Sequence, residues 1–245
     1  MSNSSVPVVF LGSLGATAQM WQPQLDSLGA EFQCIALDLL GHGSQPAPEG
    51  DYSIEQLAND VLARLDDQGV SAFHLVGLSL GGAVAQMIAL EHPERLVSLT
   101  LAATAPKFGE AQAWLDKAEL VRNEGTGALA ETVVGNWFTD ACFEKQPELP
   151  ESYAEAVRAT NDTGYAGCCM ALAGFDSRER LGEIRVPTLV IAGEQDTSTA
   201  LDVVQQLHTG ISGSTMVTIS EAKHLVNVEK AGYFNAALRE HLQRS

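Results

Sequence analysis

The sequence predicts an α/β protein built on a mostly parallel sheet, and three observations point to that class. Short, nearly continuous apolar runs recur along the chain, as in strands that are buried on both faces of a parallel sheet. Amphipathic helical patterns separate those runs before about residue 105 and after about residue 185. The stretch between has helical patterns and no convincing strand. We therefore expect an α/β core of residues 1–105 and 182–245, into which residues 106–181 are inserted as a helical cap.

Six apolar runs are the expected strands. They cover residues 6–11, 34–37, 73–77, 97–102, 188–192 and 216–219. The clearest helix follows the second run, where Ser53 and Gln56 occupy capping-box positions and Gly69 is placed to end the helix. Its apolar residues recur at helical spacing and share one face: Ile54, Leu57, Ala58, Val61, Leu62 and Leu65. A helix of this kind covers one face of a sheet.

The composition argues against several classes of function. A chain of 245 residues that is 45% apolar, with a mean hydropathy of +0.02, can bury one sizeable core. The net charge of −17 and the absence of a basic cluster oppose binding to nucleic acid or anionic membranes. No apolar run reaches the roughly 18 residues that span a bilayer, and the first five residues carry no positive charge typical of a leader. We expect a cytoplasmic protein without nucleic-acid or membrane partners.

The four cysteines match neither a disulfide scaffold nor a zinc site. Cys34 and Cys142 stand alone in the sequence, and Cys168 and Cys169 are adjacent. Free cysteine is commonly a small core residue. We expect these thiols to be buried or inert, and no pattern in the sequence predicts a bound metal.

The stretch LVGLSLGGAV, residues 75–84, places three glycines around one serine. Each glycine inside a helix or strand costs about 0.5–1 kcal/mol relative to alanine, so this clustering needs a reason. Residues 77–81 fit the G-x-S-x-G nucleophile elbow, and they lie between an expected strand and an expected helix. In this sharp turn, larger neighbouring side chains would collide with the strand or the helix. We therefore predict that Ser79 is a nucleophile at the carboxyl end of the sheet.

A serine needs a base to take its proton and a carboxylate to orient that base. His224 follows the last expected strand directly, and Asp196 lies in the loop after the preceding strand, with Glu194 as the alternative carboxylate. Four other histidines fit surface or capping positions better: His74, His92, His208 and His241. The chain order Ser79, Asp196, His224 is the one expected for the triad of an α/β-hydrolase.

Two backbone amides are the expected oxyanion-hole donors. The amide of Leu80 lies at the start of the helix that follows Ser79. The amide of Leu14 lies in the loop after the first expected strand, among small residues that let the backbone approach a reacting carbonyl: Gly12, Ser13 and Gly15. His42, in the glycine-rich loop LDLLGHGSQP, either lines the site or supports its own loop, and we favour the supporting role.

These residues resemble the α/β-hydrolase superfamily, and within it the 3-oxoadipate enol-lactonases of bacterial aromatic degradation. The similarity covers nearly the whole chain. It is carried by GHGSQ, GLSLGG, WFT at 137–139, GYAGCC at 164–169, RVPTLVIAGEQD and AKHLVNVE. The motifs inside residues 106–181 are the specific ones, because many hydrolases share the elbow and the triad.

The resemblance implies that the protein opens the five-membered ring of 3-oxoadipate enol-lactone in the β-ketoadipate pathway. Ser79 would attack to form an acyl-enzyme, and water assisted by His224 would release 3-oxoadipate. The resemblance implies neither a metal nor an organic cofactor.

The substrate of that family carries a carboxylate, which an acidic protein must admit against its own field. A local cation is therefore expected. The family pattern implies Arg122 and Arg178 as substrate-binding candidates, although arginine is more commonly a surface residue. Trp137 is expected either to wall the pocket or to pack at helical spacing with Leu129 and Val133.

The sequence departs from the family pattern in two places. Members usually have two strands before the segment equivalent to residues 6–11, so we expect a sheet that is shortened on that side. Its edge strand, near residues 34–37, would need cover from a helix, a loop or another subunit. Leu40 replaces the arginine that usually precedes Gly-His-Gly, which changes how an acidic lactone is held. The oligomeric state stays open, with a homodimer among the alternatives.

Two other functions fit the same motifs. A general carboxylesterase or a cofactor-free haloperoxidase-like hydrolase shares the elbow and the triad and would prefer neutral esters or show perhydrolysis. A ligand receptor built on a hydrolase scaffold would keep the triad for slow or single-turnover chemistry, since fold alone does not fix function. Multiple turnovers distinguish the enzymes from the receptor.

Overall fold

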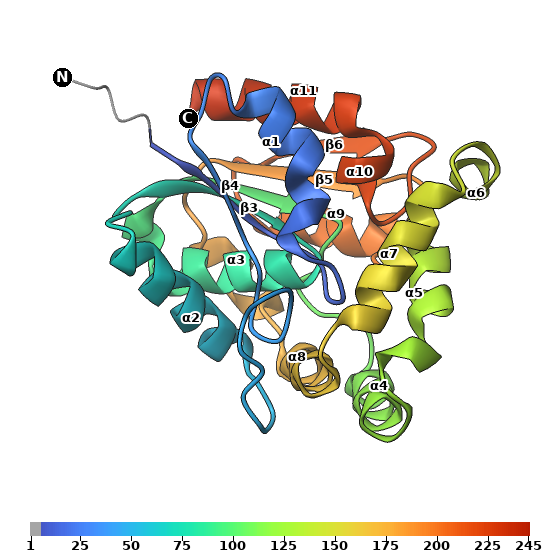
Figure 1. The fold of residues 1–245 in the computed structure, drawn as a ribbon. Coiled ribbons are helices and arrows are strands. Elements are labelled where there is room, and N and C mark those ends of the chain that lie inside the picture. Colours follow the sequence, from blue (N-terminus) through green and yellow to red (C-terminus); the bar gives the residue numbers. More distant parts are fainter. Residues whose placement is uncertain (1–5) are drawn as a thin grey trace.

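The computed structural model describes residues 6–245 (Figure 1). Residues 1–5, on which the expectation of a missing leader rests, lie outside the described part. Each pair of neighbouring strands is parallel, and the strand order across the sheet is β2-β1-β3-β4-β5-β6. The strands are β1 (Val8–Leu11), β2 (Cys34–Leu37), β3 (Phe73–Leu78), β4 (Leu96–Ala102), β5 (Thr188–Gly193) and β6 (Thr215–Ile219). The predicted α/β class and its parallel sheet are confirmed.

The helices connect the strands in sequence order. The α-helices are α1 (Gln22–Leu28), α2 (Ile54–Asp67), α3 (Leu80–Glu91), α4 (Ala111–Glu124), α5 (Ala130–Trp137), α6 (Asp140–Lys145), α7 (Glu148–Ala159), α8 (Asp162–Gly174), α9 (Leu201–Gly210), α10 (Val226–Glu229) and α11 (Ala231–Arg244). Short 3-10 turns are η1 (Ala18–Trp21), η2 (Pro93–Arg95), η3 (Thr126–Ala128) and η4 (Arg178–Glu183). Among the described residues, no helix is long and apolar enough to cross a membrane.

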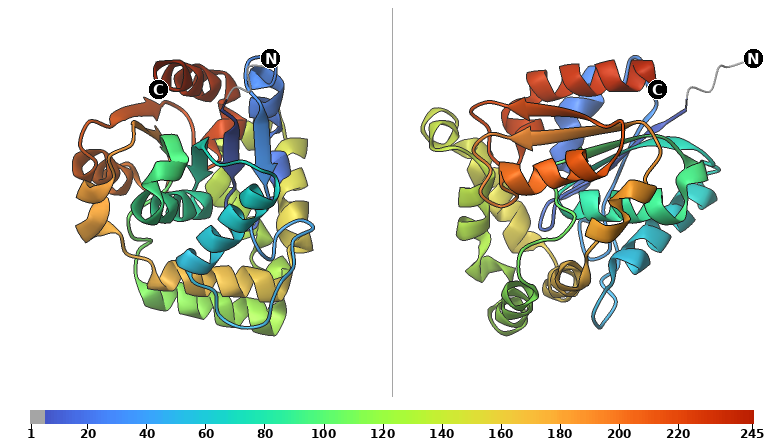
Figure 2. Two further views of the ribbon diagram at one scale, coloured as in Figure 1. Left: turned by 90° about the vertical axis from the view of Figure 1, so that its left-hand side faces the viewer. Right: turned by 180° about the vertical axis from the view of Figure 1, so that it is seen from behind.

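Helices cover both faces of the sheet. Helices α1 and α11 lie together on one face, and α2, α3 and α9 lie on the other (Figures 1 and 2). Helix α2 forms where the pattern predicted it, because Ser53 Oγ accepts a hydrogen bond from the Gln56 amide at 3.1 Å and caps its first turn. Its apolar face is buried along its whole length.

The two outer strands differ from the four inner ones in burial. Strands β1, β3 and β5 are buried throughout, as continuous apolar runs require. Every residue of β2 is only partly buried, and β6 is exposed at Thr215 and Thr218. Both strands stand at an edge of the sheet, where one side has no neighbouring strand. The predicted edge position of residues 34–37 is confirmed.

Helices α4–α8 lie between β4 and β5 in the sequence and form one group, which we call the helical region. This group lies at the end of the molecule toward which the strand arrows point (Figure 2). It meets the loop after β2 at Gly41 and Gly164, where a Cβ built on either residue would lie 2.3 Å from the Cα of the other. Helix α8 therefore passes the core loop at backbone contact.

The order of the strands indicates where along the sheet a ligand site is expected. The chain moves outward from β1 to β2 and then returns to the other side of β1 as β3. The loops that follow β1 and β3 carry Leu14 and Ser79, which line one cavity. Parallel α/β sheets bind ligands at such a point, where successive strands are added on opposite sides.

Candidate active site

Ser79 stands in a strained turn between β3 and α3. Its backbone angles are φ 56° and ψ −115°, a region that non-glycine residues rarely adopt. Hydrogen bonds hold this conformation: the Ser79 amide donates to Ala102 O at 3.1 Å, and Thr104 Oγ1 donates to Ser79 O at 2.7 Å. The serine side chain is thereby fixed at the carboxyl end of the sheet.

The glycines around Ser79 are required by close backbone approach. A Cβ at Gly77 would lie 2.3 Å from Gly81 O, and a Cβ at Gly81 would lie 2.2 Å from Leu11 O. Both distances are shorter than real contacts, and both neighbours are backbone atoms that cannot move aside independently. The glycine cluster therefore lets helix α3 start directly against β1 and β3.

Asp196 and His224 meet in the loops after β5 and β6. His224 Nδ1 lies 2.8 Å from Asp196 Oδ2, and both side chains are buried. Asp196 also accepts hydrogen bonds from the amides of Ser198 and Thr199 at 2.8 and 3.0 Å, and from Thr199 Oγ1 at 2.6 Å. Glu194 faces elsewhere, since its carboxylate accepts from the exposed Glu221 amide. Asp196 is thus the carboxylate that orients the histidine.

The surroundings of Asp196 favour its ionised form. Burial alone would raise the pKa of Asp196, but the charge of His224 and the hydrogen bonds from His224 and Thr199 hold it below its usual value. An ionised carboxylate only accepts hydrogen bonds, so His224 carries a proton on Nδ1. In the neutral ring, Nε2 is then the basic nitrogen.

Ser79 and His224 line the same cavity, which has a volume of about 220 Å³. Within residues 6–245, no hydrogen bond joins the Ser79 hydroxyl to the His224 ring. Catalytic hydrogen bonds are often long before substrate binds and shorten in the complex. The arrangement brings together all three residues of the predicted triad in and behind one cavity.

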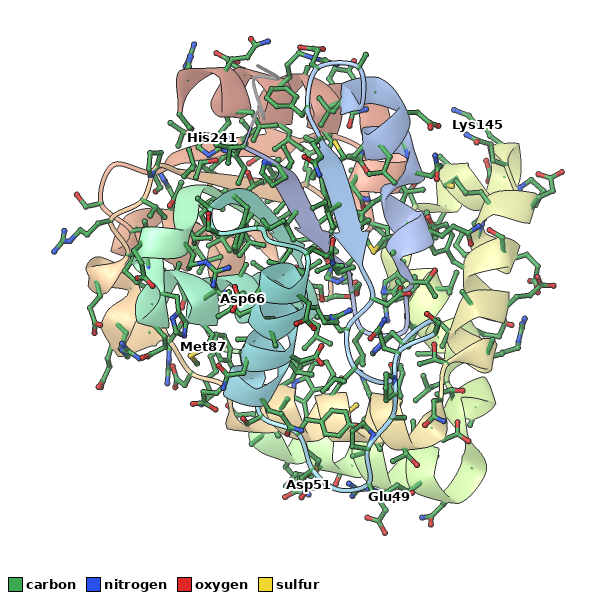
Figure 3. The ribbon with its side chains drawn as sticks, turned by 60° about the vertical axis from the view of Figure 1, so that its left-hand side comes forward. Glu49, Asp51, Asp66, Met87, Lys145 and His241 are labelled. Carbon is green, nitrogen blue, oxygen red and sulfur yellow. The ribbon has the colours of Figure 1, made fainter. Side chains whose placement is uncertain are left out.

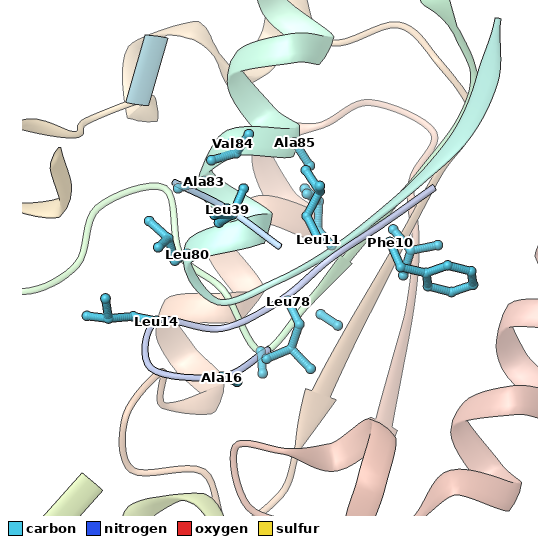
Figure 4. Packing of buried hydrophobic residues seen from close by; sticks show 14 of the residues in the cluster. Phe10, Leu11, Leu14, Ala16, Leu39, Leu78, Leu80, Ala83, Val84 and Ala85 are labelled. Carbon is cyan, nitrogen blue, oxygen red and sulfur yellow. The ribbon is translucent and has the colours of Figure 1, made fainter. Parts of the chain in front are cut away.

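The two predicted oxyanion donors are the backbone amides of Leu14 and Leu80. Amides next to them in the same loops already donate hydrogen bonds within the protein. Ser13 N donates to Met20 Sδ at 3.4 Å, Gly15 N to His42 Nε2 at 2.8 Å, and Gly81 N to Gly12 O at 2.9 Å. In the described part of the chain, the amides of Leu14 and Leu80 have no acceptor. Figure 4 shows these two residues on the loop after β1 and at the start of α3. Two unpaired amides beside Ser79 can stabilise a negative oxygen.

His42 holds the loop that carries Leu14. Its ring accepts from the Gly15 amide through Nε2 and donates to Leu40 O through Nδ1 at 3.1 Å. Burial lowers the pKa of His42, which keeps the ring neutral as that hydrogen-bond pattern requires. His42 does not line the cavity.

The structure separates the three predicted substrate-binding residues. Trp137 lines the cavity, and its ring also packs edge-on against Tyr153 at 6.2 Å. Arg122 pairs with Asp51 at 2.7 Å on the surface, at the end of the molecule where Figure 3 labels Asp51. Arg178 pairs with Asp176 at 2.6 Å. Neither arginine lines the cavity with Ser79.

The helical region supplies cavity residues that the sequence did not single out. Helix α4 contributes Trp114 and Lys117, and α8 contributes Tyr165. The nitrogen of Lys117 lies 4.2 Å from the centre of the Trp114 ring. The sequence does indicate that Trp114 and Lys117, three residues apart on one helix, share a face. It does not indicate whether that face of α4 turns toward the cavity. No group of three or more metal-ligating side chains was found among residues 6–245.

Known proteins share this fold and much of this sequence. A family model described as the alpha/beta hydrolase fold matches residues 6–231. The chain belongs to the α/β-hydrolase fold family. Family membership accounts for the parallel sheet and the elbow at Ser79, and hydrolysis is the activity that the family and its named relatives support.

One curated relative and two solved structures are similar to this chain over nearly its whole length. The 3-oxoadipate enol-lactonase 2 of Acinetobacter baylyi is 39% identical over 237 residues, which are 97% of this chain and 88% of that protein. The crystal structure of the enol-lactonase from Burkholderia xenovorans LB400 has a TM-score of 0.95 at 33% identity and covers 99% of this chain and 94% of its own. A malate-bound thermophilic esterase from Thermogutta terrifontis has a TM-score of 0.94 at 28% identity, covering 98% and 90%. The predicted resemblance to enol-lactonases is confirmed.

Proposed function

We propose that this chain is a serine hydrolase that opens the ring of 3-oxoadipate enol-lactone to give 3-oxoadipate in the β-ketoadipate pathway. The 2.8 Å contact between His224 and Asp196, at a cavity that Ser79 also lines, carries the chemical part of the proposal. The identity to the Acinetobacter enol-lactonase and the likeness to the Burkholderia enol-lactonase support the choice of substrate.

In the first half of the reaction, Ser79 Oγ attacks the lactone carbonyl while His224 Nε2 takes the serine proton. Asp196 holds the His224 ring in the required tautomer and stabilises its charged form. The negative oxygen that forms on the carbonyl carbon accepts hydrogen bonds from the Leu14 and Leu80 amides. Collapse of this intermediate breaks the ring C–O bond, and the enol oxygen leaves with the proton from His224.

In the second half, water attacks the acyl-enzyme. His224 Nε2 takes a proton from the water and then returns it to Ser79 Oγ as the ester bond breaks. The released enol becomes the 3-oxo group by tautomerisation. One water is consumed, and the protein returns to its starting state.

We further propose that residues 106–181 act as a cap on a core of residues 1–105 and 182–245. Helices α4, α5 and α8 contribute side chains to the cavity, whereas Ser79 and His224 come from the core. The Leu225 amide donates to Trp137 O at 3.1 Å, which joins the end of α5 to the loop that carries His224. Substrate would therefore sit between the two parts.

The test is a direct assay of ring opening. Purified protein is mixed with 3-oxoadipate enol-lactone, and loss of lactone absorbance is followed beside hydrolysis of a neutral aryl ester. We expect many turnovers on the lactone and a higher kcat/KM than on the ester. Unchanged lactone in the presence of ester hydrolysis would overturn the substrate while leaving the serine hydrolase.

A general esterase is the second candidate, because the Thermogutta structure with a TM-score of 0.94 is named an esterase. That enzyme would cleave neutral aryl esters with a higher kcat/KM than the lactone. The same assay thus ranks the two candidates.

A further inference from the structure

Lys117 presents a cation to the cavity from helix α4. Its ammonium lies 4.2 Å from the centre of the Trp114 ring, and both residues line the cavity with Ser79. Residues three apart on a helix are neighbours on its surface, so Trp114 and Lys117 form one patch. The face of the indole attracts the positive charge and holds it beside the ring.

The aromatic support under this ammonium is fixed by its own contacts. Trp114 Nε1 donates to Phe108 O at 2.6 Å, which sets the orientation of the indole. The Phe108 ring lies edge-on to the Trp114 ring at 6.4 Å and packs against Phe175 at 6.3 Å. The Trp114 ring beneath Lys117 is therefore held in place by contacts within the protein and does not depend on a bound ligand.

Lys117 differs from the arginines of the helical region in having no acidic partner. Arg122 pairs with Asp51, Arg158 with Glu131 and Glu151, all at the surface. In the part of the chain that the structure describes, Lys117 Nζ makes neither an ion pair nor a hydrogen bond. No Asp or Glu is among the described residues that line its cavity.

A half-buried ammonium without a counter-charge is unfavourable on its own. Burial lowers the pKa of Lys117, which shows that its surroundings disfavour the charged form. An anion bound beside it would reverse that effect and restore the ammonium. The protein carries a net charge of −17, so an anionic substrate is repelled overall and gains most from one local cation.

We infer that Lys117, supported by the Trp114 ring, binds the carboxylate of the substrate and makes the cavity selective for lactones or esters that carry a carboxylate. This inference rests on the proposed function, because it takes Ser79 as the nucleophile of the same cavity. Lys117 thus has the substrate-binding role for which the family pattern implied Arg122 and Arg178 as candidates. It acts on binding and orientation and does not exchange protons in the reaction.

The kinetic test compares Lys117→Met with Arg122→Met, which removes a cation from the exposed side of the same helix. Each protein is assayed on 3-oxoadipate enol-lactone and on its neutral methyl ester. Loss of a charge-assisted contact is expected to raise KM for the acidic lactone about tenfold to hundredfold in Lys117→Met. The kcat on that lactone and the KM for the methyl ester are expected to stay within about threefold, and Arg122→Met to match the parent protein on both.

Two kinetic results would overturn the inference. One is an equal loss on the acidic lactone and on its methyl ester, which would indicate a packing role for Lys117. The other is an equal loss in Lys117→Met and Arg122→Met, which would indicate a general field effect. A Lys117→Arg protein should recover most of the affinity, because it keeps the charge and stacks on Trp114.

A binding test separates this inference from the proposed function. Adipate, an unreactive dicarboxylate, is titrated into Ser79→Ala protein with and without Lys117→Met, and binding is followed by calorimetry and by tryptophan fluorescence. We expect saturable binding whose Kd rises at least tenfold when Lys117 is removed and which weakens with added salt. Equal Kd values, or no saturable binding by the Lys117 protein, would overturn the inference. Lysine-dependent adipate binding in a protein that does not open the lactone would leave the anion site standing and reject the proposed function.

Discussion

The sheet core and the helical region contribute to the cavity in different ways. Core residues are buried polar groups whose partners are fixed: Asp196 accepts four hydrogen bonds, and the His42 ring uses both nitrogens. The helical region contributes mainly aromatic and apolar surface and one cation, with few direct polar partners. The positions of the core side chains are therefore set by the backbone and its hydrogen bonds. The cavity surface that the helical region provides is set by which side chains its helices carry.

Glycines show the same difference at the level of single atoms. In the core, a Cβ at Gly77 or Gly81 would meet backbone at 2.2–2.3 Å. In the helical region, a Cβ at Gly135 or Gly174 would meet no atom within 4 Å. The turn at Ser79 tolerates no added atom, whereas Gly135 and Gly174 have open space around them. Gly164 of α8, at its contact with Gly41, is a crowded position of the helical region. Substitutions in the two parts should therefore produce different kinds of effect.

The largest expected effect is loss of turnover in Ser79→Ala. Removing a triad residue costs on the order of a million-fold in kcat, while the cavity and its ligand affinity are retained. Steady-state assays and adipate titration on the same preparation measure both quantities, and Ser152→Ala, at an exposed serine of α7, should match the parent protein. Retained multiple turnover would remove Ser79 from the mechanism. Tight binding without turnover in the parent protein would favour the receptor alternative.

The glycine comparison is tested by placing one methyl group in each part. Gly81→Ala should lower the free energy of unfolding by about 3 kcal/mol or more, because the new Cβ meets Leu11 O. Gly135→Ala, inside α5, should raise it by about 0.5–1 kcal/mol, because alanine is the better helix former and the site is open. Urea unfolding measures both changes. Equal destabilisation by the two substitutions would contradict the proposed difference between core and helical region.

A smaller effect is expected when the loop that carries Leu14 loses its support. His42→Ala removes the acceptor of the Gly15 amide, so we expect kcat to fall about tenfold to hundredfold with little change in KM. His208→Ala is the matched control, since His208 pairs with Ser214 away from the cavity. An unchanged kcat in His42→Ala would show that the loop keeps its position by other contacts.

The smallest effect concerns acid stability. The folded pKa of Asp196 lies below its ordinary value of 3.8, so the unfolded chain binds its proton first as pH falls. The stabilisation from Asp196 is therefore complete above about pH 5 and is lost as pH falls through the folded pKa. Urea unfolding between pH 6 and pH 3 should show a steeper decline for the parent protein than for Asp196→Asn. Parallel declines would indicate that this carboxylate is not held ionised by folding.

Much of the core was predictable because its signals are local. Each expected strand overlaps an observed one. The bounds of β2 are the same, the apolar run at residues 6–11 begins two residues before β1, and each of the other four strands extends one residue beyond its apolar run. The elbow is encoded by glycines within five residues of Ser79, and parallel strands bring their carboxyl ends to one edge. The loops of Asp196 and His224 are therefore neighbours by topology alone.

The helical region was less predictable because its contacts are not local. Which face of α4 turns toward the core decides between Lys117 and Arg122, and that rotation depends on packing against α8. Arg122 finds Asp51, which lies 71 positions earlier in the sequence. No periodicity within α4 could indicate that pairing. The partner of the Gly15 amide, the His42 ring, was hidden for the same reason.

The backbone contact between Gly41 and Gly164 limits how this architecture can change over time. Neither position can acquire a side chain while the opposite main chain keeps its path, since the two Cα atoms already occupy the available space. A substitution at either glycine must be accompanied by a change in the path of the opposite main chain, so we expect the two positions to change together during evolution. Substitutions at the cavity-lining positions of α4 and α5 need no such paired change at this crossing.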